Sequence, residues 1–283
     1  MIKFALVLPL LAATALAQDV TVRQVNDRRT NGHFSQLMIY MELPKLHDSD
    51  VAASRVLVSA ATDDAGRSLL DPEGHEPELE PNSRGMMAKD DGPPQPAVVT
   101  LTLKNPDRKA TALKEVRGEI ELFMPSKDPN STAEIAKFLS FSGKPLNHRA
   151  LKANGVEITL VSPTQLAAEK KRLGDAKRKS LKESGYDGED LESYVKSYLD
   201  SLLTLDQGEV LVRLKDPQKR IQSIVYVDPA GEAKHVSTRD EEGMTILSTW
   251  GEKPQPEWKL RVSMKTAKNV VRQPFALTNV PLP

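Results

Sequence analysis

Five histidines are the first residues of this chain that could carry chemistry, because a neutral imidazole can ligate a metal or transfer a proton. They are His33, His47, His75, His148 and His235, and no two of them have the spacing of a metal-binding pair. His47 lies beside Asp48 and Asp50, but three potential ligands in one loop indicate a metal site only weakly. We therefore expect no metal centre and no cofactor.

Motifs of nucleophilic and phosphate chemistry are absent from the sequence. No Gly-x-Ser-x-Gly frames a serine, and the chain has no cysteine that could serve as a thiolate nucleophile. Neither a Gly-x-x-x-x-Gly-Lys phosphate loop nor a dinucleotide fingerprint occurs. Two carboxylates for glycoside hydrolysis meet only in the fold, so a hydrolase with a non-local carboxylate site stays as the least favoured hypothesis. We expect no catalytic residues.

Two tryptophans are the candidates for binding a carbohydrate or another polymer. Trp250 and Trp258 flank a short polar segment and could stack on a sugar ring. The alternative is packing, because Trp258 opens an alternating segment with Leu260 and Met264 on its own face.

The balance of charge excludes one class of partner. Lys and Arg number 39, Asp and Glu number 39, and the formal net charge is zero. Without a global positive field we expect no nucleic-acid partner. Because the chain has no cysteine, a packed core rather than disulfides must stabilise it.

Residues 1–17 have the order of a secretory signal peptide. Lys3 precedes an apolar run, and Ala15-Leu16-Ala17 supplies small residues at the cleavage positions. We expect cleavage after Ala17 and a mature protein in the periplasm or outside the cell. No later apolar run is long enough to span a membrane.

Short β-branched segments bounded by Pro, Gly, Asn or Asp recur along the mature chain and predict strands. They lie at 20–25, 37–43, 56–61, 98–103, 120–124, 156–161, 210–214, 221–227, 244–247, 258–264 and 270–277. Few helices separate them. We predict an all-β fold of two tandem immunoglobulin-like β-sandwich domains, with a single larger sandwich as the alternative.

An internal duplication supports two domains. Strands 56–62 and 223–227 each run into Asp-x-Ala-Gly, which predicts a hairpin turn with glycine at positive φ. Alternating strands follow at 98–103 and 258–264, and each half closes with a strand that ends in proline. The predicted domains are 18–125 and 133–283, joined by a linker at 126–132.

The element order, the two Asp-x-Ala-Gly turns and the final segment 273–283 (QPFALTNVPLP) carry a resemblance. The chain resembles a group of uncharacterised exported β-sandwich proteins of environmental bacteria, mainly in its C-terminal half. The resemblance implies a sandwich fold and no established activity or site residue.

A helical hairpin at 163–205 is expected to interrupt the second domain. Ser162 and Pro163 start a helix that Gly185 ends, and a second helix follows Asp187. The first helix is basic and the second acidic. The second also has an apolar face, which is the candidate partner-binding surface and comprises Leu191, Tyr194, Val195, Tyr198, Leu199 and Leu202. The alternative is that this face packs on the sandwich and braces it.

The stretch 71–96 contains six prolines and many carboxylates without hydrophobic periodicity. It predicts a disordered acidic loop in the first domain. Weak calcium binding is the alternative, although no calcium-loop spacing occurs.

These features favour a non-catalytic exported module of the envelope or extracellular space that binds an unknown protein. A carbohydrate- or polymer-binding module, with an envelope polymer as partner, is the second hypothesis.

Overall fold

The computed structural model describes residues 20–30, 35–71, 74, 77–82, 95–206, 208–249 and 252–283. The expected signal peptide, 1–17, lies outside the described residues. The chain forms two compact units. Unit 1 comprises Met1–Lys127 and Ala267–Pro283, and unit 2 comprises Asp128–Thr266.

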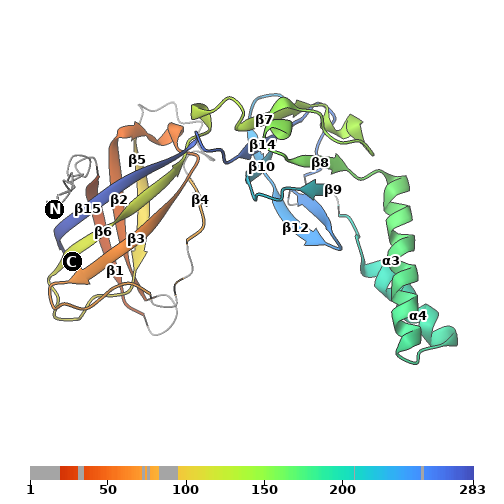
Figure 1. Cartoon of the computed structure of the whole chain (residues 1–283), viewed down its shortest axis with the longest axis horizontal. Helices are drawn as coiled ribbons and strands as arrows, with labels where there is room; N and C mark the ends of the chain where they lie inside the picture. Colours follow the sequence, from red (N-terminus) through yellow and green to blue (C-terminus); the bar gives the residue numbers. More distant parts are fainter. Residues whose placement is uncertain are drawn as a thin grey trace, which may run out of the picture. The chain divides into compact units, whose positions relative to one another are not determined.

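Two antiparallel sheets make up unit 1 (Figure 1). One has the order β1-β2-β5, built from β1 (Thr21–Arg28), β2 (Gln36–His47) and β5 (Pro96–Leu103). The other has the order β15-β6-β3-β4, built from β15 (Val270–Pro281), β6 (Ala112–Phe123), β3 (Ala53–Asp63) and β4 (Glu80–Pro81). Short 3-10 turns follow β2 and β6, η2 (Asp48–Asp50) and η3 (Pro125–Lys127).

One hydrophobic core fills the space between these two sheets. Side chains in β2 alternate between buried and half-buried, as the period of two in a strand requires. The inward-facing residues of the two sheets form one cluster that includes Leu37, Ile39, Met41, Val99, Leu101, Val56, Val116, Ile120, Phe275 and Leu277. The all-β prediction is confirmed in this unit.

Unit 2 also contains two antiparallel sheets, each of four strands. The order β11-β10-β14-β7 joins β11 (Ala233–His235), β10 (Ile221–Val227), β14 (Lys259–Met264) and β7 (Thr132–Ala136). The order β12-β13-β9-β8 joins β12 (Ser237–Glu241), β13 (Met244–Ser248), β9 (Glu209–Lys215) and β8 (Glu157–Leu160). Between β7 and β8 lie η4 (Phe138–Phe141) and α2 (Arg149–Ala153).

Aromatic side chains mark the core of unit 2. Phe138 stacks on Tyr226, with ring centroids 5.1 Å apart and planes 15° apart. Trp258 lies 6.2 Å from Tyr226 at a tilt of 47°. All three belong to one buried cluster that also contains Leu260 and Val262. The Tyr226 ring therefore sits at the centre of the core between two other rings.

The two units share one pattern of strand pairing. The order β1-β2-β5 in unit 1 corresponds to β8-β9-β13 in unit 2, where β12 adds an edge strand. Likewise β15-β6-β3-β4 corresponds to β7-β14-β10-β11. The place beside β6 is taken by the last strand of the chain, whereas the equivalent place beside β14 is taken by the first strand of unit 2.

This arrangement differs from the predicted domain boundaries at the C-terminal end. The predicted second domain, 133–283, includes β15, but β15 pairs with β6 in unit 1 from Val270↔Phe123 to Pro281↔Ala112. The physical reason is that Phe275 and Leu277 complete the core of unit 1. The sequence also predicted that strand 98–103 of the first domain is equivalent to strand 258–264 of the second. This is wrong, because β14 corresponds to β6 and not to β5.

The two Asp-x-Ala-Gly turns have the same hydrogen bonds, as the sequence predicts. In the first turn, Asp63 Oδ1 accepts from the Arg67 N–H at 2.7 Å, and Gly66 has φ of +83°. In the second, Asp228 Oδ1 accepts from the Glu232 N–H at 2.8 Å, and Gly231 has φ of +86°. The repeated motif therefore encodes the same turn after β3 and after β10.

Part of the stretch predicted to be disordered is ordered. Residues 80–81 form β4, which pairs with β3 at Ser54↔Glu80. Asn82 Nδ2 donates to the backbone oxygens of Asp48 and Val51, each at 3.2 Å. Backbone groups at the edge of a sheet are free to hydrogen-bond a short additional strand, and such an edge strand tolerates proline. Residues 72–73, 75–76 and 83–94 of the stretch lie outside the described residues.

Candidate functional site

The insertion between β8 and β9 consists of two helices, α3 (Pro163–Glu183) and α4 (Gly188–Ser201). Ser162 and Gln165 form a capping box at the start of α3, with bonds of 3.2 Å and 3.0 Å between side chains and backbone amides. Gly185, at φ of +88°, ends the helix, and the Tyr186 N–H donates to the Leu181 oxygen at 3.1 Å. We call this pair of helices the hairpin.

The apolar face of α4 is largely buried, and its C-terminal part packs with residues of β9 and β13. Leu191, Val195 and Leu202 are buried. Leu202 belongs to a cluster that contains Leu173 of α3 together with Leu211, Met244 and Ile246 of the underlying strands, and Tyr198 and Leu199 pack against it. Five of the six candidate partner-binding residues are therefore buried or half-buried. Tyr198, Leu199 and Leu202 lie in or against the cluster shared with β9 and β13, whereas Leu191 and Val195 are buried outside that cluster.

Close helix contact and ion pairs hold the hairpin together. Gly174 is buried in α3, and a Cβ atom added there would lie 3.0 Å from Leu199 Cδ1 of α4. Arg178 forms a two-pronged ion pair with Glu192 across the helices, at 2.8 Å and 3.0 Å. At the sheet end, Glu241 Oε1 accepts from the Leu203 N–H at 2.8 Å. These contacts therefore hold the two helices together and join them to the sheet.

Tyr186 and Tyr194 form an exposed aromatic pair at the far end of the hairpin. Their ring centroids are 5.1 Å apart in an edge-to-face arrangement, and the residues are 41% and 53% exposed. Leu205, just after α4, is 37% exposed. Within the described ranges these three are the exposed large hydrophobic residues, and all belong to the predicted insertion 163–205. We call Tyr186 and Tyr194 the tip pair.

Trp258 is not available as a polymer-binding platform. It is 5% exposed and packs in the core of unit 2, because it faces Tyr226 and shares its sheet face with Leu260. Its partner in the hypothesis, Trp250, lies outside the described residues.

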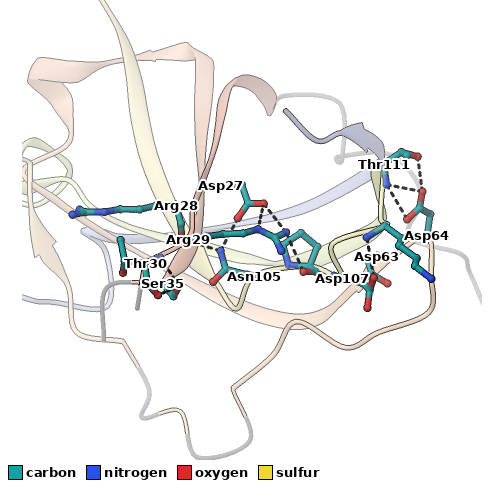
Figure 2. Close-up of polar contacts among 12 residues, drawn as sticks. Asp27, Arg28, Arg29, Thr30, Ser35, Asp63, Asp64, Asn105, Asp107 and Thr111 are labelled. Atoms are coloured by element: carbon teal, nitrogen blue, oxygen red, sulfur yellow. Dashed lines mark hydrogen bonds and ion pairs between the residues drawn. The ribbon is translucent and has the colours of Figure 1, made fainter. Parts of the chain in front are cut away.

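A cluster of polar side chains lies in unit 1, among the loops that follow β1, β3 and β5 (Figure 2). Asp27 accepts from Asn105 Nδ2 at 2.6 Å and from Arg29 Nε at 2.8 Å. Asp63 is fully buried, and its Oδ2 accepts from the Asp107 N–H at 2.9 Å. These carboxylates join three loops at one end of the unit.

The same cluster includes Asp64 and Thr111 (Figure 2). Asp64 Oδ2 accepts from the Thr111 hydroxyl at 2.7 Å and from its N–H at 3.0 Å, and these bonds lower the pKa of the Asp64 carboxyl. Each of these carboxylates accepts a hydrogen bond from a backbone or side-chain donor of another loop. The cluster therefore braces the turns that it joins.

The described ranges contain no candidate metal site. No group of three or more His, Asp or Glu side chains there could hold a metal ion. His148 Nδ1 accepts from the Ala150 N–H at 3.1 Å and caps α2. Asp48, the neighbour of His47, has its Oδ1 bonded by Asn82 at 2.5 Å. His33 and His75 lie outside the described residues.

A hollow of about 800 Å³ in unit 1 is lined by residues of β3 and β5. The residues that line it include Val56 and Leu101 of the core and the charged Arg55, Glu78 and Lys104. Residues 75–76 and 83–94, which neighbour lining residues in the sequence, are not among those described. The hollow therefore supports no assignment.

None of the helices in the described part of the chain is long and apolar enough to cross a membrane. Comparison with protein-family models, with curated proteins and with solved structures finds no match to this chain.

The sequence pattern identifies only one residue of the tip pair. Tyr194 falls on the predicted apolar face of α4, but Tyr186 precedes that helix and belongs to no periodic pattern. The signal that could have found it is Gly185, because the residue after a helix-ending glycine commonly makes an apolar contact. The loop cluster of unit 1 was missed, since its members are far apart in sequence.

Proposed function

We propose that this protein is a non-catalytic, exported protein-interaction module whose recognition surface is the tip pair. The observation that carries this proposal is the distribution of exposed apolar side chains. In the described ranges the exposed large hydrophobic residues all lie in the insertion at 163–205, and two of them touch each other. Exposed apolar side chains gathered in one place are typical of interaction sites.

The support of the tip pair favours a protein partner. Tyrosine offers large contact area with little conformational entropy to lose, and it is enriched where interfaces have their binding energy. Here the two tyrosine rings contact each other, and the Tyr186 N–H is hydrogen-bonded to the end of α3. The Arg178–Glu192 ion pair joins the two helices. A surface ordered in advance reduces the entropic cost of binding.

The experiment places a photo-reactive crosslinker at Tyr194 or, as a matched control, at Ser193 of the same helix. Both residues are exposed. The cell envelope fraction of the source organism is then irradiated. We expect a discrete protein adduct from position 194 that the substitution Tyr186→Ser abolishes, and none from 193. Equal labelling at both positions would contradict the proposal.

Polymer binding is the second candidate function, and the tip pair rather than Trp258 is what favours it. Exposed aromatic rings also stack on sugar rings. Retention of the wild-type chain on insoluble envelope polysaccharide, lost in Tyr186→Ser with Tyr194→Ser, would select this function over protein binding.

We also propose an immunoglobulin-like fold for the two units, export of the protein, and membership in the group that its sequence resembles. The spatial orders β8-β9-β13-β12 and β11-β10-β14-β7 fit the ABED and C′CFG sheets of an immunoglobulin-like sandwich, with β7, the first strand of unit 2, in the place of strand G. Unit 1 fits the same scheme without its D strand. Export with cleavage after Ala17 places the module in the periplasm or outside the cell. Membership in the group of uncharacterised exported β-sandwich proteins fits both.

A further inference from the structure

The last strand of unit 1 reaches it only after the chain has passed through the whole of unit 2. β15 pairs with β6 along its length, from Val270↔Phe123 to Pro281↔Ala112. It places Phe275, Leu277 and Val280 in the core of unit 1. Without β15, unit 1 therefore lacks one edge of a sheet and part of its core.

Folded unit 2 brings together the two segments that lead to β6 and β15. In unit 2, Thr132 of β7 pairs with Ser263 of β14, and the Met264 N–H donates to the Ser131 oxygen at 2.7 Å. In unit 1, the Met124 N–H donates to the Asn269 oxygen at 2.8 Å. Only the short segments 125–130 and 265–268 remain between these two closures.

Unfolding of unit 2 alone would remove this closure. β6 and β15 would then be joined by the free chain 128–266, and unit 1 would have to close that long loop to keep β15 in place. Loop closure of this length disfavours such a state by a factor on the order of 10³. The opposite partial state has no such cost, because β7 to β14 are contiguous in sequence and pair without help from unit 1.

We infer that folded unit 2 acts as a clasp that holds β15 on unit 1. Unit 2 does not unfold while unit 1 stays folded, whereas unit 1 can open while unit 2 remains folded. The two units are thereby coupled through chain connectivity, and the coupling restricts which partly folded states the protein populates. It is independent of what the tip pair binds.

The test uses the full chain with one added crosslink. Thr132 and Ser263 are register partners, and the chain has no cysteine of its own, so Thr132→Cys with Ser263→Cys provides a single disulfide that can be formed or reduced. When formed, it keeps the two crossing segments together even if the rest of unit 2 unfolds. The substitution Leu260→Ala, at a fully buried position, destabilises unit 2 in both forms.

Two readouts separate the units during unfolding in urea. Trp258 lies in the core of unit 2, and Trp250 falls within the same sequence range, so tryptophan fluorescence reports that unit. Pulsed hydrogen exchange with mass spectrometry reports the amides of β6 and β15 in unit 1. In the reduced protein we expect the two readouts to change together. In the oxidised protein we expect a range of urea in which fluorescence has changed while β15 stays protected.

A β15 that stays protected after the fluorescence change in the reduced protein would overturn the inference, as would identical behaviour of the two forms. The matched control is Leu122→Ala, which is fully buried in unit 1. It should open β6 and β15 at lower urea than the fluorescence change in either form. If Leu260→Ala does not fold, Ile224→Val gives a milder destabilisation of unit 2 at another buried position.

Discussion

Tyr226 shows at the scale of one residue how the core of unit 2 depends on protonation. Its ring is fully buried between Phe138 and Trp258, and its hydroxyl has no hydrogen-bond partner among the residues that the structure describes. Burial raises the pKa of the Tyr226 phenol far above its ordinary value. The neutral ring is stable there, and a phenolate is not.

We predict that unit 2 loses stability as the pH rises above about 10, where an unfolded tyrosine ionises. The folded state then holds a proton that the unfolded state releases, so the free energy of unfolding falls with pH. Absorbance at the phenolate band should show Tyr226 ionising only together with the loss of native tryptophan fluorescence.

The control is Tyr226→Phe. It removes the unpartnered hydroxyl, so stability near neutral pH should be unchanged or higher by up to about 1 kcal/mol. It should also weaken the alkaline loss. A marked destabilisation by this substitution would show that the hydroxyl has a partner in solution.

Glu121 is a second buried group, and it lies on the outer side of the sheet of unit 1. It is 2% exposed and is flanked by its register partners Arg55 of β3 and Arg272 of β15. Both arginines form ion pairs with it, Arg272 at 2.6 Å. Burial acts to raise the pKa of Glu121, but the two arginines outweigh it and the net pKa is lowered.

We predict that unit 1 is stabilised by Glu121 at neutral pH and loses this contribution as the pH falls below about 4. Glu121→Gln should lower the free energy of unfolding by about 1–3 kcal/mol at neutral pH, discounted because Arg272 is largely exposed to solvent. Hydrogen exchange of β6 at about pH 7 and pH 3 measures the effect. An equal cost at both pH values would contradict the assignment.

At the scale of elements, the hairpin packs on β9 and β13 through Leu173 of α3 and the C-terminal part of α4. Leu199 is half-buried, meets Gly174 across the helices and packs on the cluster that covers β9 and β13. We predict that Leu199→Asp lowers the free energy of unfolding of unit 2 by about 1–3 kcal/mol, because a carboxylate is moved into an apolar contact. Urea unfolding followed by tryptophan fluorescence measures this.

Tyr194→Asp is the matched control on the same helix. Its side chain is exposed, so the same charge should leave the midpoint almost unchanged. A stable Leu199→Asp protein would mean that α4 separates from the sheet in solution, and its inner face would again be available to a partner.

The helices, strands and turns were largely predictable from the sequence, but the elements that they pack against were not. The capping pattern at Ser162 and the helix-ending Gly185 gave both ends of α3, and Asp-x-Ala-Gly gave two turns. The 3.6-residue period of α4 indicated a buried face without indicating what buries it, since Leu211 and Met244 are distant in sequence. Likewise Gly118 became explicable only in the sheet, where an added Cβ would lie 2.1 Å from the Leu57 oxygen.

At the scale of the whole molecule, the domain boundary failed for a physical reason. Phe275 and Leu277 alternate as they would in any half-buried strand, so their pattern fits the core of either unit. Only the pairing of β15 with β6 decides between them. The exposed tip pair depended in the same way on tertiary structure, because the pattern of α4 cannot separate Tyr194 from its buried neighbours.

We predict that residues 128–266 fold alone, because every strand of unit 2 lies within that range. Residues 18–127 should not fold alone, since they lack β15. Joining 267–283 directly after residue 127 through a short Gly-Ser link should restore a cooperative unfolding transition. Circular dichroism during thermal unfolding measures all three proteins. A folded 18–127 fragment would contradict the requirement for β15.

The insertion of unit 2 between β6 and β15 also determines how the protein responds to mechanical tension. A pull between residues 20 and 283 acts on two positions in unit 1, so unit 2 carries no tension while β15 stays paired with β6. Once β15 peels away, the pull passes through 128–266, and full extension of that segment would lengthen the chain by about 450 Å. Unit 2 is therefore protected from the applied force while unit 1 is folded, and it can extend only after β15 has detached from β6.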